Sequence, residues 1–98
     1  MLQVEISQEQ LSTLCRRHQI RWLAMFGSAL RGDFGPKSDI DIVVEFEPTA
    51  RISLLDYARI QRELSDLFHR PVDLVTREGL KPLIKQTILE NAEVLYAT

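Results

Sequence analysis

Two groups of residues carry side chains suited to chemistry, and ten residues separate them. The first is the small-residue turn Gly27-Ser28, and the second is the carboxylate pair Asp39 and Asp41. Glycine lets a phosphate approach the backbone because it has no Cβ, and the serine hydroxyl can donate a hydrogen bond. Carboxylates are preferred ligands of Mg²⁺. This combination suits metal-assisted nucleotidyl transfer, in which a nucleoside triphosphate is attacked at its α-phosphate.

The carboxylates need a strand to bring them together. Residues two apart on a strand share a face, with Cα atoms about 6.5–7 Å apart, so Asp39 and Asp41 would point the same way. Asp73 is the third candidate, because it is the one charged residue in the short apolar segment 72–76. Three converging carboxylates repel one another unless a cation is present. We therefore expect Mg²⁺ here, as two ions about 3.5–4 Å apart.

The phosphate-binding residues would lie between the two groups. Gly27 and Ser28 would receive the triphosphate at a strand-to-helix turn, where free N–H groups favour anions. Arg31 and Lys37 could pair with its oxygens, the arginine as a fork and the lysine as a point charge. Each residue could instead have an ordinary structural role: the turn is a common one, Arg31 and Lys37 could be surface charges, and Asp73 could be an edge-strand charge that blocks aggregation. Their order along the chain favours the nucleotide site.

The elements that must position these residues alternate between helical and strand periodicity, which predicts one α/β (α+β) domain over residues 1–98 with a mixed sheet. We expect about three strands, flanked by about four helices. The strands are predicted at 20–26, 39–46 and 72–76. The helices are predicted at 7–18, at 28–31, at 51–69 and from 80 or 81 onward.

The hydrophobic pattern predicts which side chains face the core. On the first helix these are Leu11, Leu14 and Cys15, and on the 39–46 strand they are the even positions. The 51–69 helix carries a stripe made of Leu54, Tyr57, Ala58, Leu64, Leu67 and Phe68. The last helix would bury Leu83, Ile84, Thr87, Ile88 and Ala92, with Pro82 in its first turn.

Composition excludes several classes of protein. The formal net charge of −2 over 98 residues gives no basic excess, so a stand-alone nucleic-acid binder is disfavoured. Cys15 is the only cysteine, so no internal disulfide can form, which fits a reducing compartment. The start of the chain lacks a signal-peptide pattern, and no apolar run is long enough for a membrane span. We expect a cytoplasmic protein without a membrane role.

His18 and His69 suit helix ends, and no zinc-ligand spacing occurs.

Phe26-Gly27-Ser28, ten residues and Asp39-Ile40-Asp41 resemble the Gly-Ser-x10-Asp-x-Asp signature of the DNA polymerase β-like nucleotidyltransferase superfamily. The short length and the segment Pro71-Val72-Asp73 resemble its minimal branch, the MNT-domain proteins. The resemblance implies the nucleotidyltransferase fold, Mg²⁺ on Asp39, Asp41 and Asp73, and a triphosphate positioned by Gly27 and Ser28.

The resemblance also implies a partner. Minimal proteins of this kind pair with a helical HEPN-domain toxin, and the MNT member acts as antitoxin by transferring AMP from ATP to a tyrosine of the toxin. Larger superfamily members hold the acceptor on a second domain, for which 98 residues leave no room. A hetero-oligomer is therefore expected, in which the third predicted helix and the tail Val94-Leu95-Tyr96 either dock the partner or complete this domain's own core.

Two alternatives stay open. The chain could be a nucleotide-binding antitoxin that neutralises its partner by complex formation alone, or a nucleotidyltransferase acting on a small molecule such as an antibiotic.

Overall fold

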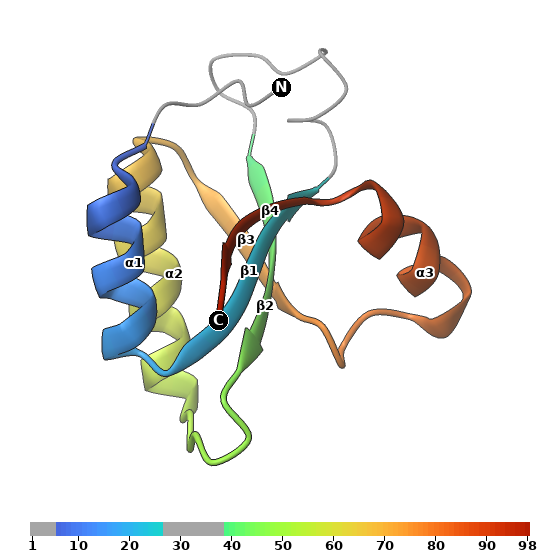
Figure 1. Cartoon of the computed structure of the whole chain (residues 1–98), viewed down its shortest axis with the longest axis horizontal. Helices are drawn as coiled ribbons and strands as arrows, with labels where there is room; N and C mark the ends of the chain where they lie inside the picture. Colours follow the sequence, from blue (N-terminus) through green and yellow to red (C-terminus); the bar gives the residue numbers. More distant parts are fainter. Residues whose placement is uncertain (1–5, 27–38) are drawn as a thin grey trace.

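Four strands form one mixed sheet in the computed structural model, which describes residues 6–26 and 39–98 (Figure 1). The strands are β1 (Ile20–Phe26), β2 (Ile40–Phe46), β3 (Val72–Thr76) and β4 (Glu93–Ala97). Their order across the sheet is β3-β2-β1-β4. β2 and β3 run parallel, whereas β1 is antiparallel to both β2 and β4. The two inner strands, β1 and β2, are thus the strands that the sequence predicted on either side of the Gly-Ser turn.

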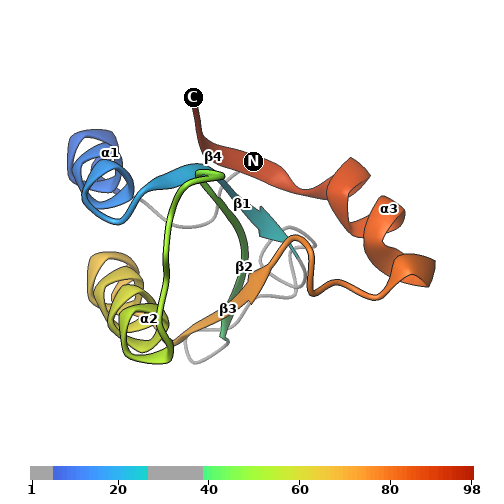
Figure 2. The same ribbon diagram turned by 90° about the horizontal axis from the view of Figure 1, so that it is seen from below.

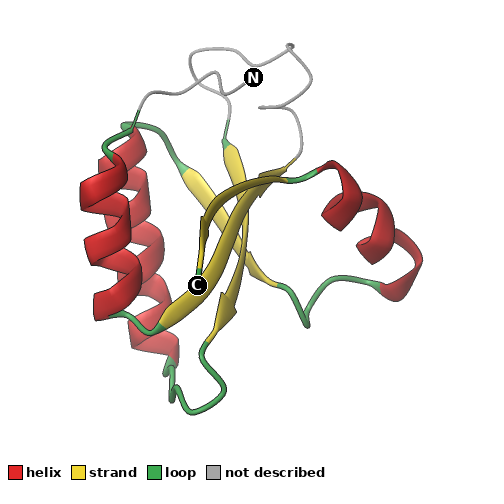
Figure 3. Cartoon of the chain, in the orientation of Figure 1, coloured by secondary structure: helices red, strands yellow, loops and turns green. Residues whose placement is uncertain are grey.

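The helices of the described part are α1 (Gln8–Arg17), α2 (Leu54–Phe68) and α3 (Pro82–Asn91). Figure 2 shows α1 and α2 side by side on one face of the sheet and α3 on the opposite side. Figure 3 shows the same division, with α3 reached by a loop that leaves the end of β3. Within the described ranges, no helix has the length and apolar character needed to cross a membrane.

The main core lies between the sheet and the helices α1 and α2. Ile40, Ile42 and Val44, the even positions of β2, are fully buried there, as the period-2 pattern predicted. The predicted inward residues of α1 are buried as well: Leu11, Leu14 and Cys15. Burial raises the pKa of the Cys15 thiol from 9.0 to about 12. Cys15 is therefore a neutral core residue at physiological pH.

Side chains cap the starts of α1 and α2. Ser7 Oγ accepts the backbone N–H of Gln10 at 3.2 Å, which satisfies one free donor of the first turn of α1. Ser53 and Asp56 form a reciprocal capping box at α2, with both hydrogen bonds at 3.1 Å. This box explains why α2 begins at Leu54, three residues later than the sequence predicted. Leu54 is consequently 89% exposed, and its predicted place in the buried stripe is wrong.

The prediction for the rest of the α2 stripe is partly right. Leu64 and Phe68 are buried as predicted, and Ile60, which the prediction omitted, is buried with them. Ala58 is exposed, whereas Tyr57 and Leu67 are half-buried at the margin of the core. The helix therefore faces the sheet along a line that is turned slightly from the predicted one.

The prediction for the last helix is wrong in its packing. Pro82 does occupy the first turn, but no residue of α3 is buried. Leu83 is 95% and Ile84 48% exposed, Thr87 is also exposed, and Ala92 lies just beyond the helix. The helical pattern in the sequence was real, but α3 stands away from the main core.

The C-terminal tail forms a fourth strand, which the sequence analysis did not predict. β4 pairs with β1, and Leu95 is buried in the main core. Leu95 thus completes this domain's own core, whereas Val94 remains 53% exposed. The expected helix at 28–31 lies outside the described residues.

Candidate functional site

Two of the three predicted carboxylates are brought to the same level by the pairing of β2 with β3. Asp41 and Asp73 are partners in the parallel register, directly across from each other. Neighbouring strands lie about 4.8 Å apart, so the two backbones are adjacent at this point. Asp39 stands two residues before Asp41, at the start of β2. Phe26, the last residue of β1, is also a partner of Asp41, so β1 ends level with the carboxylates.

Backbone hydrogen bonds fix this register at both ends of β3. The Ile40 amide donates to the Pro71 carbonyl at 2.8 Å, and the Arg77 amide donates to the Val44 carbonyl at 2.9 Å. A shift by one residue would move every side chain to the other face of the sheet. Because Val72 and Leu74 are buried in the core, such a shift is prohibitively costly. The core therefore holds Asp73 on the face opposite α1 and α2.

The other odd positions of β2 carry different neighbours. Val43 follows Asp41 on the same face and is fully buried. Glu45 comes next and lies 3.6 Å from the Arg21 Nε and 3.4 Å from the Arg77 Nη1. The guanidinium of Arg77 also stacks over Trp22, 5.1 Å from the ring centroid, a cation–π contact. This face of β2 is thus acidic at both ends, and at the Glu45 end two arginines compensate the charge.

The donor chemistry of the carboxylates fits Mg²⁺. Within residues 6–26 and 39–98, no three His, Cys, Asp or Glu side chains are gathered closely enough to form a metal-binding group. Mg²⁺, however, is usually held by one or two carboxylates and completes its shell with water and substrate phosphates. Asp41 and Asp73, directly opposite each other on neighbouring strands, offer two such carboxylates.

The phosphate-binding half of the predicted site is a sequence prediction only. Gly27, Ser28, Arg31 and Lys37 lie outside the described residues. Of the seven predicted site residues, the structure therefore places Asp39, Asp41 and Asp73.

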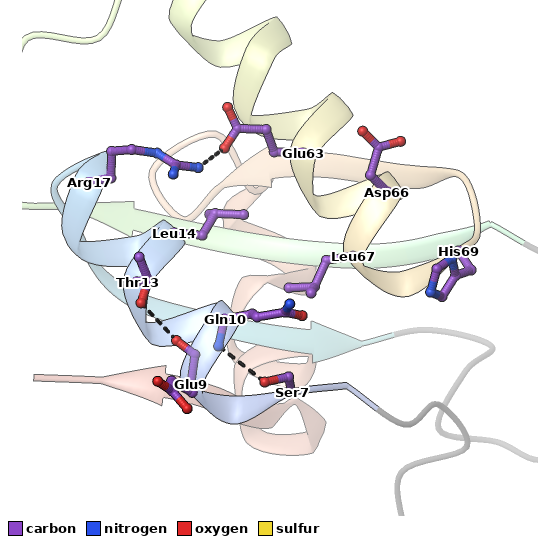
Figure 4. A pocket seen from close by; sticks show the side chains of 10 residues that line it. All are labelled: Ser7, Glu9, Gln10, Thr13, Leu14, Arg17, Glu63, Asp66, Leu67 and His69. Carbon is purple, nitrogen blue, oxygen red and sulfur yellow. Dashed lines mark hydrogen bonds and ion pairs between the residues drawn. The ribbon is translucent and has the colours of Figure 1, made fainter.

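A concave region lies away from these carboxylates, between α1 and α2. It encloses about 820 Å³ and is lined by residues of both helices, including Gln10, Thr13, Glu63 and Asp66 (Figure 4). Glu63 is paired there with Arg17 and lies 3.0 Å from His18 Nε2. Burial alone would raise the pKa of Glu63, but the hydrogen bonds from His18 and Arg17 outweigh it and lower that pKa. The charge of Glu63 is therefore compensated by Arg17 and His18 at the end of α1.

The sequence analysis missed the hydrogen bonds that side chains of α2 make to the β3 backbone on either side of Asp73. Tyr57 donates its hydroxyl to the Leu74 carbonyl, while Gln61 and Ser65 accept backbone N–H groups of β3. Burial and the nearby charge of Asp73 raise the pKa of the Tyr57 phenol. All three are polar residues at four-residue spacing on α2, a pattern that the ordinary polar face of a helix shares.

Comparison with known proteins agrees with this arrangement. The model of the nucleotidyltransferase domain family matches residues 7–95. The protein adenylyltransferase MntA of Thermococcus cleftensis is 39% identical over 83 residues, which cover 85% of this chain and 80% of that protein.

Two solved toxin–antitoxin structures share the fold. One, a toxin–antitoxin with AMP-PNP, has a TM-score of 0.73 at 21% identity and covers 95% of this chain and 75% of that chain. The other, a tri-AMPylated HEPN toxin of Shewanella oneidensis in complex with an MNT antitoxin, has a TM-score of 0.64 at 19% identity, over 93% and 70% of the two chains. With the motif, the strand register and a family match over nearly its whole length, this chain belongs to the nucleotidyltransferase domain family.

Proposed function

We propose that the chain transfers AMP from ATP to a hydroxyl group of a partner HEPN-domain toxin, with a tyrosine as the acceptor, and thereby acts as antitoxin. The observation that carries the proposal is the strand register, in which Asp41 and Asp73 are partners and Asp39 lies two residues before Asp41. The family match supports the class of reaction. The relative named as a protein adenylyltransferase supports AMP as the transferred group.

The partner is supported by the structural neighbours. They are toxin–antitoxin complexes, one with an ATP analogue and one with an AMPylated HEPN toxin. The acceptor then belongs to another chain, so the complex is a hetero-oligomer. The sequence shows no basic excess and gives no reason for a direct nucleic-acid role.

Asp39, Asp41 and Asp73 would hold Mg²⁺ on the face of the sheet opposite α1 and α2. When bound, Mg²⁺ neutralises the charge that builds on the phosphate oxygens during transfer. Gly27 and Ser28 would receive the triphosphate, and Arg31 and Lys37 would pair with its oxygens, as the sequence predicts.

The transfer is a displacement at phosphorus. The acceptor oxygen forms a bond to the α-phosphorus, the bond from that phosphorus to the oxygen bridging to the β-phosphorus breaks, and pyrophosphate leaves. The proton of the acceptor hydroxyl must go to a base near the attacking oxygen. We assign this role to a carboxylate oxygen of Asp73, which is exposed on the edge strand.

The test is transfer of radioactive label from α-labelled ATP, with Mg²⁺, to a co-purified partner protein. γ-Labelled ATP and the Asp39→Asn/Asp41→Asn variant are the controls. Label should reach the partner from the α-position only, and it should disappear in the variant. A stable complex that binds nucleotide but never acquires label would replace the proposal with a non-catalytic antitoxin. Label on a small molecule incubated with this chain alone would replace it with a small-molecule transferase.

A further inference from the structure

The strand that carries Asp73 lies at one edge of the sheet. An edge strand leaves a row of backbone N–H and C=O groups without strand partners. Here three side chains of α2 meet that row, and we call Tyr57, Gln61 and Ser65 the polar ladder. α2 lies beside β3 in Figure 2, so the ladder stands between the helix and the free edge of the strand.

Each rung of the polar ladder is a hydrogen bond to the backbone. Ser65 Oγ accepts the Val72 N–H at 3.0 Å, and Gln61 Oε1 accepts the Leu74 N–H at 3.2 Å. Tyr57 donates its hydroxyl to the Leu74 carbonyl. Asp73 lies between Val72 and Leu74. Side chains of α2 therefore hold the backbone on both sides of Asp73, from the free edge of the strand.

The geometry of the two elements makes this pairing regular. Four residues of an α-helix advance about 6 Å, and two residues of a strand advance about 6.5–7 Å. Residues four apart on a helix share a face, and residues two apart on a strand share an edge. Ser65 and Gln61 thus match Val72 and Leu74 rung by rung, with α2 antiparallel to β3.

We propose that the polar ladder is a positioning device, in which Tyr57, Gln61 and Ser65 hold β3 at the position along β2 that places Asp73 beside Asp41. The inference deepens the proposed function, because it concerns the same carboxylates, and it rests on that proposal for their role. A ladder that served only to cover the edge would affect aggregation and stability and leave metal binding unchanged. The two roles can therefore be separated.

The test uses the full chain with matched changes on one helix. Gln61→Leu removes the acceptor of the Leu74 amide at nearly constant size, and Gln61→Glu keeps an oxygen in the same place. Arg62→Leu is the control, because it introduces the same side chain at the next residue, which is exposed. Asp41→Asn marks the loss expected when a carboxylate itself is removed. Urea unfolding checks that every variant is folded.

The main measurement is the affinity of the chain for Mn²⁺ with no other ligand added. It is obtained from the electron paramagnetic resonance signal of the free ion. We expect about tenfold weaker binding for Gln61→Leu, the scale found when a group that orients a metal ligand is removed. Gln61→Glu, which retains an acceptor oxygen, and Arg62→Leu should not show this loss, because both changes make the local charge more negative. Amide hydrogen exchange at Leu74 should accelerate in Gln61→Leu only. If Gln61→Leu does not fold, Tyr57→Phe takes its place, with weaker Mn²⁺ binding again expected.

The outcomes separate this inference from the proposed function. Faster exchange at Leu74 with unchanged Mn²⁺ affinity overturns the positioning role, and so does a wild-type chain that binds no Mn²⁺. If Mn²⁺ binding depends on the polar ladder but no AMP reaches the partner, the proposed function fails and the positioning role stands.

Discussion

The groove between α1 and α2 and the strand pair β2–β3 both carry carboxylates, but the fold holds those carboxylates differently. In the groove, Glu63 pairs with Arg17 and His18, so its charge serves the contact between the two helices. At the strand pair, the parallel register brings Asp41 and Asp73 to the same level, with Asp39 close by. No ion pair between described residues involves Asp39 or Asp73. The Glu63 contact in the groove is therefore structural, and the strand pair is the region to which the proposed function assigns the chemistry.

Glu45 shows the same compensation of charge within one strand, β2. It lies on the same face of β2 as Asp41, but Arg21 and Arg77 compensate its charge. At Glu45 and Glu63 the fold thus supplies the counter-charges itself. At the other end of this face, the parallel register brings Asp41 level with Asp73.

The largest effect is expected from removing a carboxylate at the strand pair. Asp41→Asn should slow AMP transfer to the partner by roughly 10²–10³-fold, the scale for losing one preorganised electrostatic group. Glu45→Gln, the matched change on the same strand face, should leave the rate nearly unchanged. Initial rates with α-labelled ATP measure both. Equal losses in the two variants would mean that the acidic face matters only through its overall charge.

The next effect concerns the helix-covered face. Leu64→Ala should lower the free energy of unfolding by about 2–5 kcal/mol, because Leu64 is fully buried and its truncation leaves a cavity. Leu83→Ala, at a site that is 95% exposed, should stay within about 0.5 kcal/mol. Urea unfolding checks both. A large loss from Leu83→Ala would show that α3 packs more closely than its exposure indicates.

A smaller effect is expected at the start of α2. Ser53→Ala removes the acceptor of the Asp56 amide and breaks the capping box, which should cost about 1 kcal/mol. The measurement is urea unfolding, with Ser53→Asp as a control that retains a capping oxygen. Because α2 carries the polar ladder, loss of the cap should leave the Leu74 amide protected if only the first turn of the helix frays.

The smallest effect is a pH dependence in the groove. The folded-state pKa of Glu63 is lowered from 4.5, so ionised Glu63 stabilises the fold above that pH. This contribution is lost as the pH falls through the folded-state pKa. Glu63→Gln should therefore flatten the acid side of a profile of unfolding free energy against pH. An unchanged acid limb would assign the acid sensitivity to other carboxylates, such as Asp56, whose pKa the Ser53 hydrogen bonds also lower.

Local patterns predicted the strands well. The bounds of β1 and β3 agree with those predicted, and β2 begins one residue later than expected, because alternation and punctuating residues are local signals. β4 was missed because its pairing depends on the free edge of β1, which is remote in the sequence. The shared face of Asp39 and Asp41 stays a prediction, because β2 begins at Ile40. Only the parallel register could place Asp73 opposite Asp41.

The packing of the helices was predicted less well, because tertiary contacts decide which surface a helix meets. The apolar face of α3 implied burial, yet Leu83 and Ile84 are exposed, since periodicity does not say which surface a helix meets. Tyr57, Gln61 and Ser65 were read as ordinary helix residues or, for Tyr57, as core. Their role at the edge of β3 depends on how α2 lies along that strand, and no local pattern encodes it.

The most direct test of which region binds the metal is paramagnetic line broadening by Mn²⁺ in the presence of AMP-PNP. Backbone amide signals of the full chain would be followed during the titration. We predict the strongest broadening at Asp41 and Asp73, with little at Glu63 and Asp66. Broadening centred on Glu63 and Asp66, in the groove between α1 and α2, would contradict the assignment of the site to the strand pair.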